Sequence, residues 1–148
     1  MWRRAAGLAP VSIGDTVAAA LGEMRSLAVE LMADTIRVER ATGTQTMDPD
    51  TLEMVDALET VHEGLGRVQR SGQLSPHESV SGEVEFGVNA LMVQLPLSAS
   101  GIRKNDRVTV VAVGPVSDPD MSGLVATVQA NLTKTHATKR TLVCEEVT

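Results

Sequence analysis

The amino-acid sequence predicts a mainly β protein, a small antiparallel β-barrel with one N-terminal amphipathic α-helix and a long flexible loop between strands. Three runs in the last third of the chain alternate Val, Thr and Leu with small or polar residues: Arg107–Val113, Leu124–Leu132 and Thr141–Val147. A cluster of Gly, Pro and Asp, Gly114–Gly123, separates the first two runs, and a polar stretch precedes the third. This pattern is typical of half-buried antiparallel strands. Strong helical periodicity occurs in one segment, Thr16–Met32.

The chain has 148 residues, with 13 Lys and Arg against 19 Asp and Glu and a formal net charge of −6. This length fits one domain with a sizeable core, which we divide into an N-terminal extension (1–14), a helix (15–33) and a barrel (34–148). Proteins that grip a phosphate backbone need clustered Lys and Arg, and single-strand binders use aromatic platforms. The acidic balance and the scarcity of aromatic residues, with Trp2, Phe86 and no Tyr, argue against both classes.

The lone Cys144 excludes an intramolecular disulfide and fits a reducing compartment. Its place in a strand pattern favours a small buried apolar residue over a reactive thiol. The first residues resemble a signal peptide only superficially, because Pro10 and Gly14 break the apolar run. Since no run approaches the roughly 20 apolar residues of a membrane span, we expect a soluble protein, intracellular when made, with no membrane partner.

The predicted helix carries one apolar stripe at the i, i+3, i+4, i+7 spacing. The members of the stripe are Val17, Ala20, Leu21, Met24, Leu27, Ala28 and Leu31. Ser12 and Asp15 resemble a capping box with Asp in place of Glu, although Asp15 could equally be the cap itself. The stripe packs either on the barrel or, in part, on a neighbouring subunit, and the sequence does not separate these interpretations.

The first half of the barrel is predicted to begin with the strand Asp34–Arg40, whose Ile36 and Val38 face inward. The polar stretch Thr42–Asp50 is predicted to be a turn. Leu52–His62 fits both a helix start and a strand pattern, and we interpret most of it as strand.

A Ser-rich loop follows, with glycines near both ends and little apolar mass. It consists of Ser71, Gly72, Gln73, Leu74, Ser75, Pro76, His77, Glu78, Ser79, Val80, Ser81 and Gly82. Such a stretch buries too little surface to offset its ordering entropy, so we expect it to be mobile in the free subunit. Loops of about 12 residues or more inside compact domains are uncommon and often functional, and a surface excursion without a role is the alternative.

Glu83–Leu97 is predicted to be a long strand in which the apolar parity switches near Asn89–Ala90, as at a bulge or sharp bend. Pro96 belongs at the strand end. In the later strand, alternation predicts one shared face for Leu124, Ala126, Val128, Ala130 and Leu132.

Two polar loops of the second half carry basic residues that form one patch if the loops meet in space. These residues, with one at the start of the strand between the loops, are Arg103, Lys104, Arg107, Lys134, Lys139 and Arg140.

Motifs with a known chemical mechanism do not occur in the sequence. The histidines His62, His77 and His136 stand far apart, with no Cys or carboxylate at zinc-like spacing. His136 sits among basic neighbours and is interpreted as part of a solvated turn. No P-loop, G-x-S-x-G or G-x-G-x-x-G is present. We therefore expect no enzymatic activity, no cofactor and no metal.

Several short segments, in this order and spacing, carry a family resemblance: Leu31–Arg40, Gly66–Gln69, Val93–Leu97, Gly101–Val110, Asp118–Pro119, Gly123–Val128 and His136–Val147. Together they resemble the head-to-tail stopper, or head-completion, proteins of long-tailed phages, in the version common among actinobacterial phages. The extension Met1–Gly14 and the stretch Met54–Thr60 match less well.

The resemblance implies a small β-barrel that assembles as a ring, expected to be a dodecamer, in the virion neck. The ring would sit between an adaptor ring on the portal and the tail terminator or tail tube proteins, and would close the channel after packaging. Double-stranded DNA would pass through without specific binding. The loop Ser71–Gly82 would be the plug, and Arg103, Lys104, Lys134, Lys139 and Arg140 are candidate contacts to neighbouring subunits or partners. The protein would be made in the host bacterial cytoplasm.

A second interpretation, from another class, is a small barrel module that binds nucleic acid or a small ligand through its basic residues. For a ring protein we expect the isolated subunit to be largely monomeric and to assemble on the adaptor, because the sequence has no large exposed apolar run.

Overall fold

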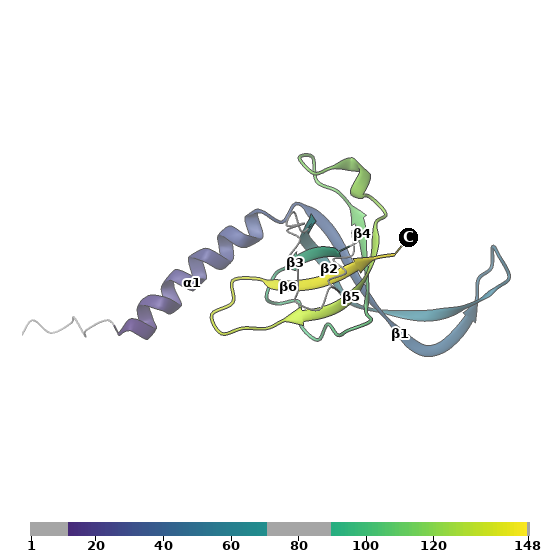
Figure 1. The fold of residues 1–148 in the computed structure, drawn as a ribbon, viewed down its shortest axis with the longest axis horizontal. Coiled ribbons are helices and arrows are strands. Elements are labelled where there is room, and N and C mark those ends of the chain that lie inside the picture. The colour runs from purple at the N-terminus through teal and green to yellow at the C-terminus, as the bar shows by residue number, and fades with distance from the viewer. Residues whose placement is uncertain (1–11, 71–89, 148) are drawn as a thin grey trace, which may run out of the picture.

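Six antiparallel strands close into a barrel, and one α-helix precedes them in the described residues (Figure 1). The structure is a computed structural model that describes residues 12–70 and 90–147. Its elements are α1 (Ile13–Glu30), β1 (Asp34–Met47), β2 (Met54–Arg70), β3 (Ala90–Leu95), β4 (Arg107–Ala112), the 3-10 turn η1 (Pro119–Met121), β5 (Val125–Leu132) and β6 (Arg140–Glu146). The strand order is β1-β2-β3-β6-β5-β4, and β4 pairs back onto β1. The predicted fold class is confirmed.

The barrel interior is filled by every second residue of the strands, because side chains alternate across a sheet. Its core consists of Ile36, Val38, Leu91, Val93, Leu95, Ala99, Ile102, Val108, Val110, Ala126, Val128, Leu142 and Cys144. The inward direction of Ile36 and Val38 and the burial of Cys144 are confirmed. β3 ends one residue before Pro96, as predicted. Residues 83–89, where the change of parity is predicted, lie outside the described residues.

β2 passes over the core at Gly66, a position that has no room for a side chain. A Cβ there would lie 2.5 Å from Ile36 Cγ1 and 2.9 Å from Leu95 Cδ2, well inside the optimal carbon–carbon separation. The glycine therefore lets β1, β2 and β3 approach closely enough to close this side of the barrel.

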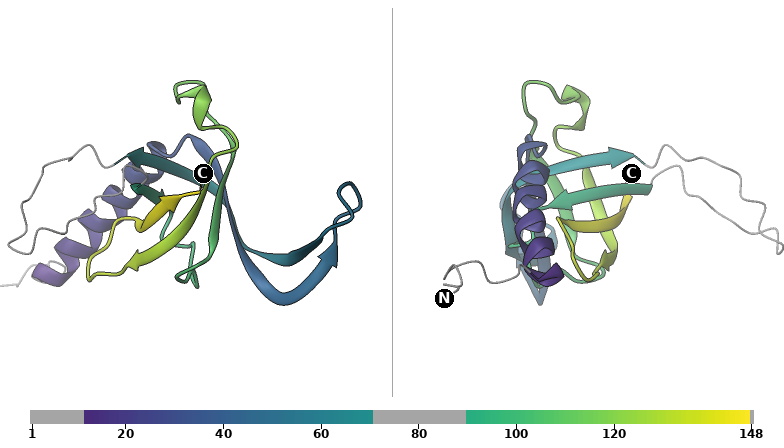
Figure 2. Two further views of the ribbon diagram at one scale, coloured as in Figure 1. Left: turned by 45° about the vertical axis from the view of Figure 1, so that its right-hand side comes forward. Right: turned by 90° about the vertical axis from the view of Figure 1, so that its left-hand side faces the viewer.

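β1 and β2 continue beyond the barrel as a two-stranded arm, residues 41–60, which projects to one side (Figures 1 and 2). The predicted turn at Thr42–Asp50 is wrong, because β1 runs to Met47. Three polar residues, Thr42 to Thr44, form a bulge opposite Ala57, with Gly43 at φ +83°. The Thr42 hydroxyl donates to the Ala57 carbonyl at 3.0 Å, so the bulge keeps this polar stretch in the ladder. The prediction of strand for most of Leu52–His62 is confirmed.

A second bulge reverses the parity of β5. Val128 pairs with Cys144 but Ala130 pairs with Val143, which leaves Gln129 as the extra residue. Beyond it Asn131 lies opposite the buried Leu142, and Leu132 is 49% exposed. The prediction that Ala130 and Leu132 share the buried face of Val128 is wrong, because one inserted residue moves every later side chain to the other face.

The helix begins and ends earlier than predicted, at Ile13 and Glu30 instead of residues 15 and 33, so two residues assigned to the extension belong to it. The capping box is present: the Asp15 N–H donates to Ser12 Oγ at 3.1 Å, and the Ser12 N–H donates to Asp15 Oδ2 at 3.4 Å. No residue of α1 is buried. A hydrogen bond joins the helix to the loop between β5 and β6: Arg25 Nε donates to the Ala137 carbonyl at 3.1 Å.

The apolar stripe of α1 is divided along its length. Val17, Leu21 and Ala28 are half-buried, whereas the other members, Ala20, Met24, Leu27 and Leu31, are exposed. One edge of the stripe is therefore half-buried, and the other edge is uncovered. In residues 12–70 and 90–147, no helix is long and apolar enough to cross a membrane.

Candidate interaction surfaces

Two loops meet at one end of the barrel and bring together basic residues from distant parts of the chain. The loops are 96–106, between β3 and β4, and 133–139, between β5 and β6. Asn131 Nδ2 donates to the Ile102 carbonyl at 3.1 Å. Arg140 donates from Nε to the Ala99 carbonyl at 3.0 Å and from a terminal nitrogen to the Leu97 carbonyl at 3.3 Å. The strand ends that flank loop 133–139 thus bind loop 96–106, which places both loops at the same end of the barrel. We call these two loops the basic end.

The five candidate contact residues do not have equal roles in the basic end. Arg103, Lys104 and Lys134 are exposed, and Lys139 is half-buried. None of these four forms an ion pair within the described part of the chain. Arg140 is half-buried and directs its donors to backbone carbonyls, so it holds the loops together instead of offering its charge outward.

A buried ion pair fixes loop 96–106. Arg40 donates from Nε to Asp106 Oδ1 at 2.9 Å and from a terminal nitrogen to Oδ2 at 2.8 Å. The Arg103 N–H donates to Oδ2 at 2.8 Å, and Arg40 also reaches the Gly101 carbonyl at 2.6 Å. Burial alone raises the pKa of Asp106, but the hydrogen bonds and charges of Arg40 and Arg103 outweigh it, so this pKa lies below its usual value. One carboxylate therefore ties β1 to the loop that carries Arg103 and Lys104.

The plug loop predicted from the resemblance, Ser71–Gly82, lies outside the described residues. Its described flanks are neighbours, because Arg70 of β2 pairs with Leu91 of β3. The intervening segment therefore connects two adjacent positions of the barrel wall.

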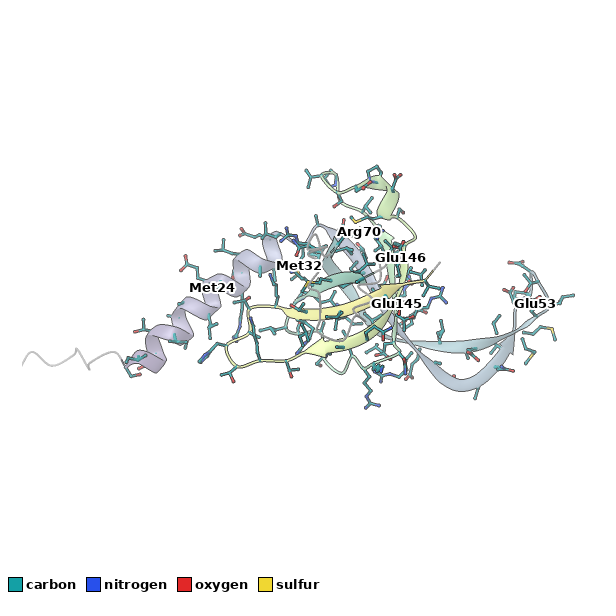
Figure 3. All side chains as sticks on the ribbon, in the orientation of Figure 1. Met24, Met32, Glu53, Arg70, Glu145 and Glu146 are labelled. Carbon is teal, nitrogen blue, oxygen red and sulfur yellow. The ribbon has the colours of Figure 1, made fainter. Side chains whose placement is uncertain are left out.

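Beside these flanks lies a polar hollow of about 360 Å³. Arg70 and Glu146 form an ion pair at 2.9 Å in its wall (Figure 3), and Asp118 and Asp120 line it from the loop between β4 and β5. Asp118 accepts from the Asp120 N–H at 2.9 Å and caps η1, which fits the predicted turn. The described residues that line the hollow include carboxylates, a guanidinium and Ser122, and among them there is no Cys and no His to activate that hydroxyl.

Reactive groups elsewhere are held in unreactive settings. Burial raises the pKa of the Cys144 thiol to about 12, so the thiolate is scarce at neutral pH. Burial lowers the pKa of His62 in β2, and its Nε2 has no hydrogen-bond partner among the described residues. Within residues 12–70 and 90–147, no group of three or more His, Cys, Asp or Glu side chains is placed to hold a metal ion.

Two apolar surfaces are exposed; sequence reasoning missed the one on the arm and left open whether the stripe of α1 is covered by the barrel. On the arm, Met47 is 60% exposed, Leu52 71% and Met54 55%. On α1, Met24 and Leu27 are exposed by 53% and 55%. The expectation of a monomer rested on the absence of exposed apolar runs, and that premise is wrong. The clustering of Met and Leu among acidic residues in the stretch 47–58 was the available signal.

The comparisons with known proteins agree with the fold. The solution structure of protein SF1141 from Shigella flexneri 2a is similar, with a TM-score of 0.52 and 20% sequence identity over 78% of this chain and 92% of that one. At this identity the likeness concerns the fold alone. No curated protein matches the chain significantly. A model of one protein family matches residues 24–145, and the chain therefore belongs to that family, the family of unknown function DUF6093.

Proposed function

We propose that this chain is a structural ring protein of the phage virion neck, a head-to-tail stopper. It closes the portal channel after DNA packaging and provides a docking surface for the tail. The proposal is supported by the ordered segments that resemble stopper proteins and, above all, by one observation. A small closed barrel carries a long insertion between two paired wall positions, Arg70 and Leu91, where the resemblance places a channel plug.

The ring, a dodecamer by resemblance, stacks between the adaptor ring on the portal and the tail terminator or tail tube. Many copies of the plug segment Ser71–Gly82 then face one channel at high effective concentration, so that weak contacts add up. The net charge of −6 per chain disfavours adhesion to the DNA backbone that must later slide through.

The function is tested by replacing Ser71–Gly82 with a short Asn-Gly turn. Because closure entropy changes slowly with loop length, the barrel should fold, and heads should package DNA, attach the ring and then leak. Leakage is measured as DNase-sensitive DNA released from purified heads. The control is Val116→Ser, a change at a 90% exposed residue of the loop between β4 and β5, which should leave retention unchanged. DNA retention equal to that of wild-type heads would refute the plug assignment.

The second candidate, a nucleic-acid-binding module, is favoured by the meeting of the two basic loops. Arg103, Lys104 and Lys134 present three cations on one end of the barrel. Filter binding with duplex and single-stranded DNA at physiological salt separates the candidates. A neck ring should show no submicromolar binding, and a binding module should show it and lose it in Lys104→Glu with Lys134→Glu.

A further inference from the structure

The arm has an apolar face and an acidic charge. Register places Met47 opposite Met54 and Ala41 opposite Leu58, and the period-two alternation of β2 puts Met54 and Leu58 on one face. The pair Gln45 and Asp56 lies on the same face, between these two apolar pairs. Leu52 adds an apolar side chain at the tip. Residues 41–60 contain no Lys, Arg or His, and their carboxylates are Asp48, Asp50, Glu53, Asp56 and Glu59.

The opposite side of the molecule has an apolar face on α1 beside a loop with two lysines. Met24, Leu27 and Leu31 form the uncovered edge of the α1 stripe, and the helix itself carries Arg25 against Asp15, Glu23 and Glu30. Arg25 joins the helix to loop 133–139 through the Ala137 carbonyl, and the basic charge of this side comes from Lys134 and Lys139 of that loop. We call this surface, α1 with loop 133–139, the receiving surface.

The two surfaces cannot meet within one chain. The arm and α1 project from opposite sides of the barrel in Figure 1 and in the left view of Figure 2, and Figure 3 shows Met24 and Glu53 at the two extremes. A contact between different surfaces of two copies is heterologous, and repetition of such a contact gives a closed ring or an open filament.

Both elements also lack the support that such elements normally need. A two-stranded hairpin is marginally stable alone in water, and helices in proteins draw most of their stability from packing an amphipathic face. The arm strands, 41–47 and 54–60, extend roughly 20 Å at about 3.3 Å per residue. The helix Ile13–Glu30 extends roughly 27 Å at about 1.5 Å per residue. The uncovered edge of the stripe, from Ala20 to Leu31, extends roughly 16 Å at the same rise, so most of the arm's face can lie along it.

We propose that the arm of one copy docks on the receiving surface of the next copy, with its apolar face on the α1 stripe and its carboxylates beside Lys134 and Lys139. The occupant is a second copy of this chain, because opposite charge and matching apolar faces occur on its two sides. This inference rests on the ring proposed above and identifies the contact that builds it.

Charge reversal tests the docking. One variant carries Glu53→Lys with Asp56→Lys on the arm, and a second carries Lys134→Glu with Lys139→Glu on the receiving surface. The four side chains form no hydrogen bond or ion pair within the described residues, so the barrel should keep its circular dichroism spectrum and melting temperature. A control, Asp120→Lys with Glu145→Lys, makes the same charge change at exposed residues outside the arm. It removes one exposed hydrogen bond, from Gln129 to Glu145 at 3.3 Å, so its melting temperature is measured beside that of the other variants.

Sedimentation velocity over a wide concentration range gives the readout. Wild-type protein and the control should associate, and the association should weaken as salt rises. Each charge-reversed variant alone should associate at least about tenfold more weakly. An equimolar mixture of the two should recover association, because each arm then finds an opposite charge on the other variant.

Three results would overturn the docking: a wild-type chain that stays monomeric at the highest attainable concentration, a control as weak as the arm variant, or a mixture that does not recover. These results are separable from failure of the proposed function. If heads retain DNA when the gene is deleted, the neck role fails, yet recovery in the mixture still supports the docking. If arm-reversed chains still build rings on heads that retain DNA, the docking fails and the neck role stands.

Discussion

Asp106 forms an ion pair with Arg40 that anchors loop 96–106, and the replacement of Asp106 by Asn tests how much this ion pair stabilises the barrel. Asp106 is 2% exposed, and its carboxylate accepts three N–H hydrogen bonds, two from Arg40 and one from Arg103. Removing one member of a buried ion pair costs about 3 to 5 kcal/mol, because the remaining charge is left unpaired. The Arg40 side chain is 25% exposed and regains some water, so we expect a loss of about 3 kcal/mol in the free energy of unfolding.

In a chain of this size that loss lowers the melting temperature by roughly 9 °C, which thermal unfolding followed by circular dichroism detects. The matched control is Glu63→Gln, which breaks the ion pair of Arg37 and Glu63 at 3.3 Å. There the side chains are 37% and 44% exposed. Screening by water limits that loss to about 0.5 kcal/mol. Equal destabilisation by the two substitutions would refute the assignment of Asp106 as the anchor of loop 96–106.

The same carboxylate gives stability a dependence on pH. The pKa of Asp106 in the folded chain lies below its ordinary value, so in acid the unfolded chain binds this proton first. Its contribution is complete above the unfolded pKa of about 3.9 and is lost as pH falls through the folded pKa. Wild-type protein should therefore lose more stability than Asp106→Asn as pH falls below about 4. Parallel pH profiles for the two proteins would contradict this reasoning.

Three further outcomes are expected. Gly66→Ala should lower the free energy of unfolding by about 2 kcal/mol, because its Cβ meets two core side chains. Gly22→Ala, on the open surface of the helix, should raise it by about 0.5 kcal/mol. Urea unfolding measures both changes. Leu142→Ala should lower the free energy of unfolding by about 3 kcal/mol, because Leu142 is buried. Leu132→Ala should lower it by less than about 0.5 kcal/mol, because the Gln129 bulge leaves Leu132 exposed. Equal losses would contradict that bulge. Cys144 should resist iodoacetamide at neutral pH in folded protein and react in urea, as mass spectrometry would show; rapid labelling of the folded chain would contradict its burial.

The local patterns in the sequence determined the barrel strands and the helix cap. The alternation in β1 identified Ile36 and Val38 as core residues, because a strand with one buried face must turn its alternate apolar side chains inward. The run Arg107–Val113 was recognised as a strand, and the structure shows that its Val108 and Val110 face the core. The cap at Ser12 was readable because it depends on side chains three residues apart.

Tertiary structure decided the features that depend on a partner strand or loop. Thr42–Thr44 and Gln129 are bulges only in relation to Ala57 and Cys144 across the ladder, so the composition of β1 indicated a turn and that of β5 an unbroken face. The basic end likewise exists because Asn131, turned inward by the Gln129 bulge, reaches the Ile102 carbonyl. The sequence also left open whether α1 packs on its own barrel. An apolar stripe predicts that one face of a helix is buried, but it does not identify the surface on which that face packs.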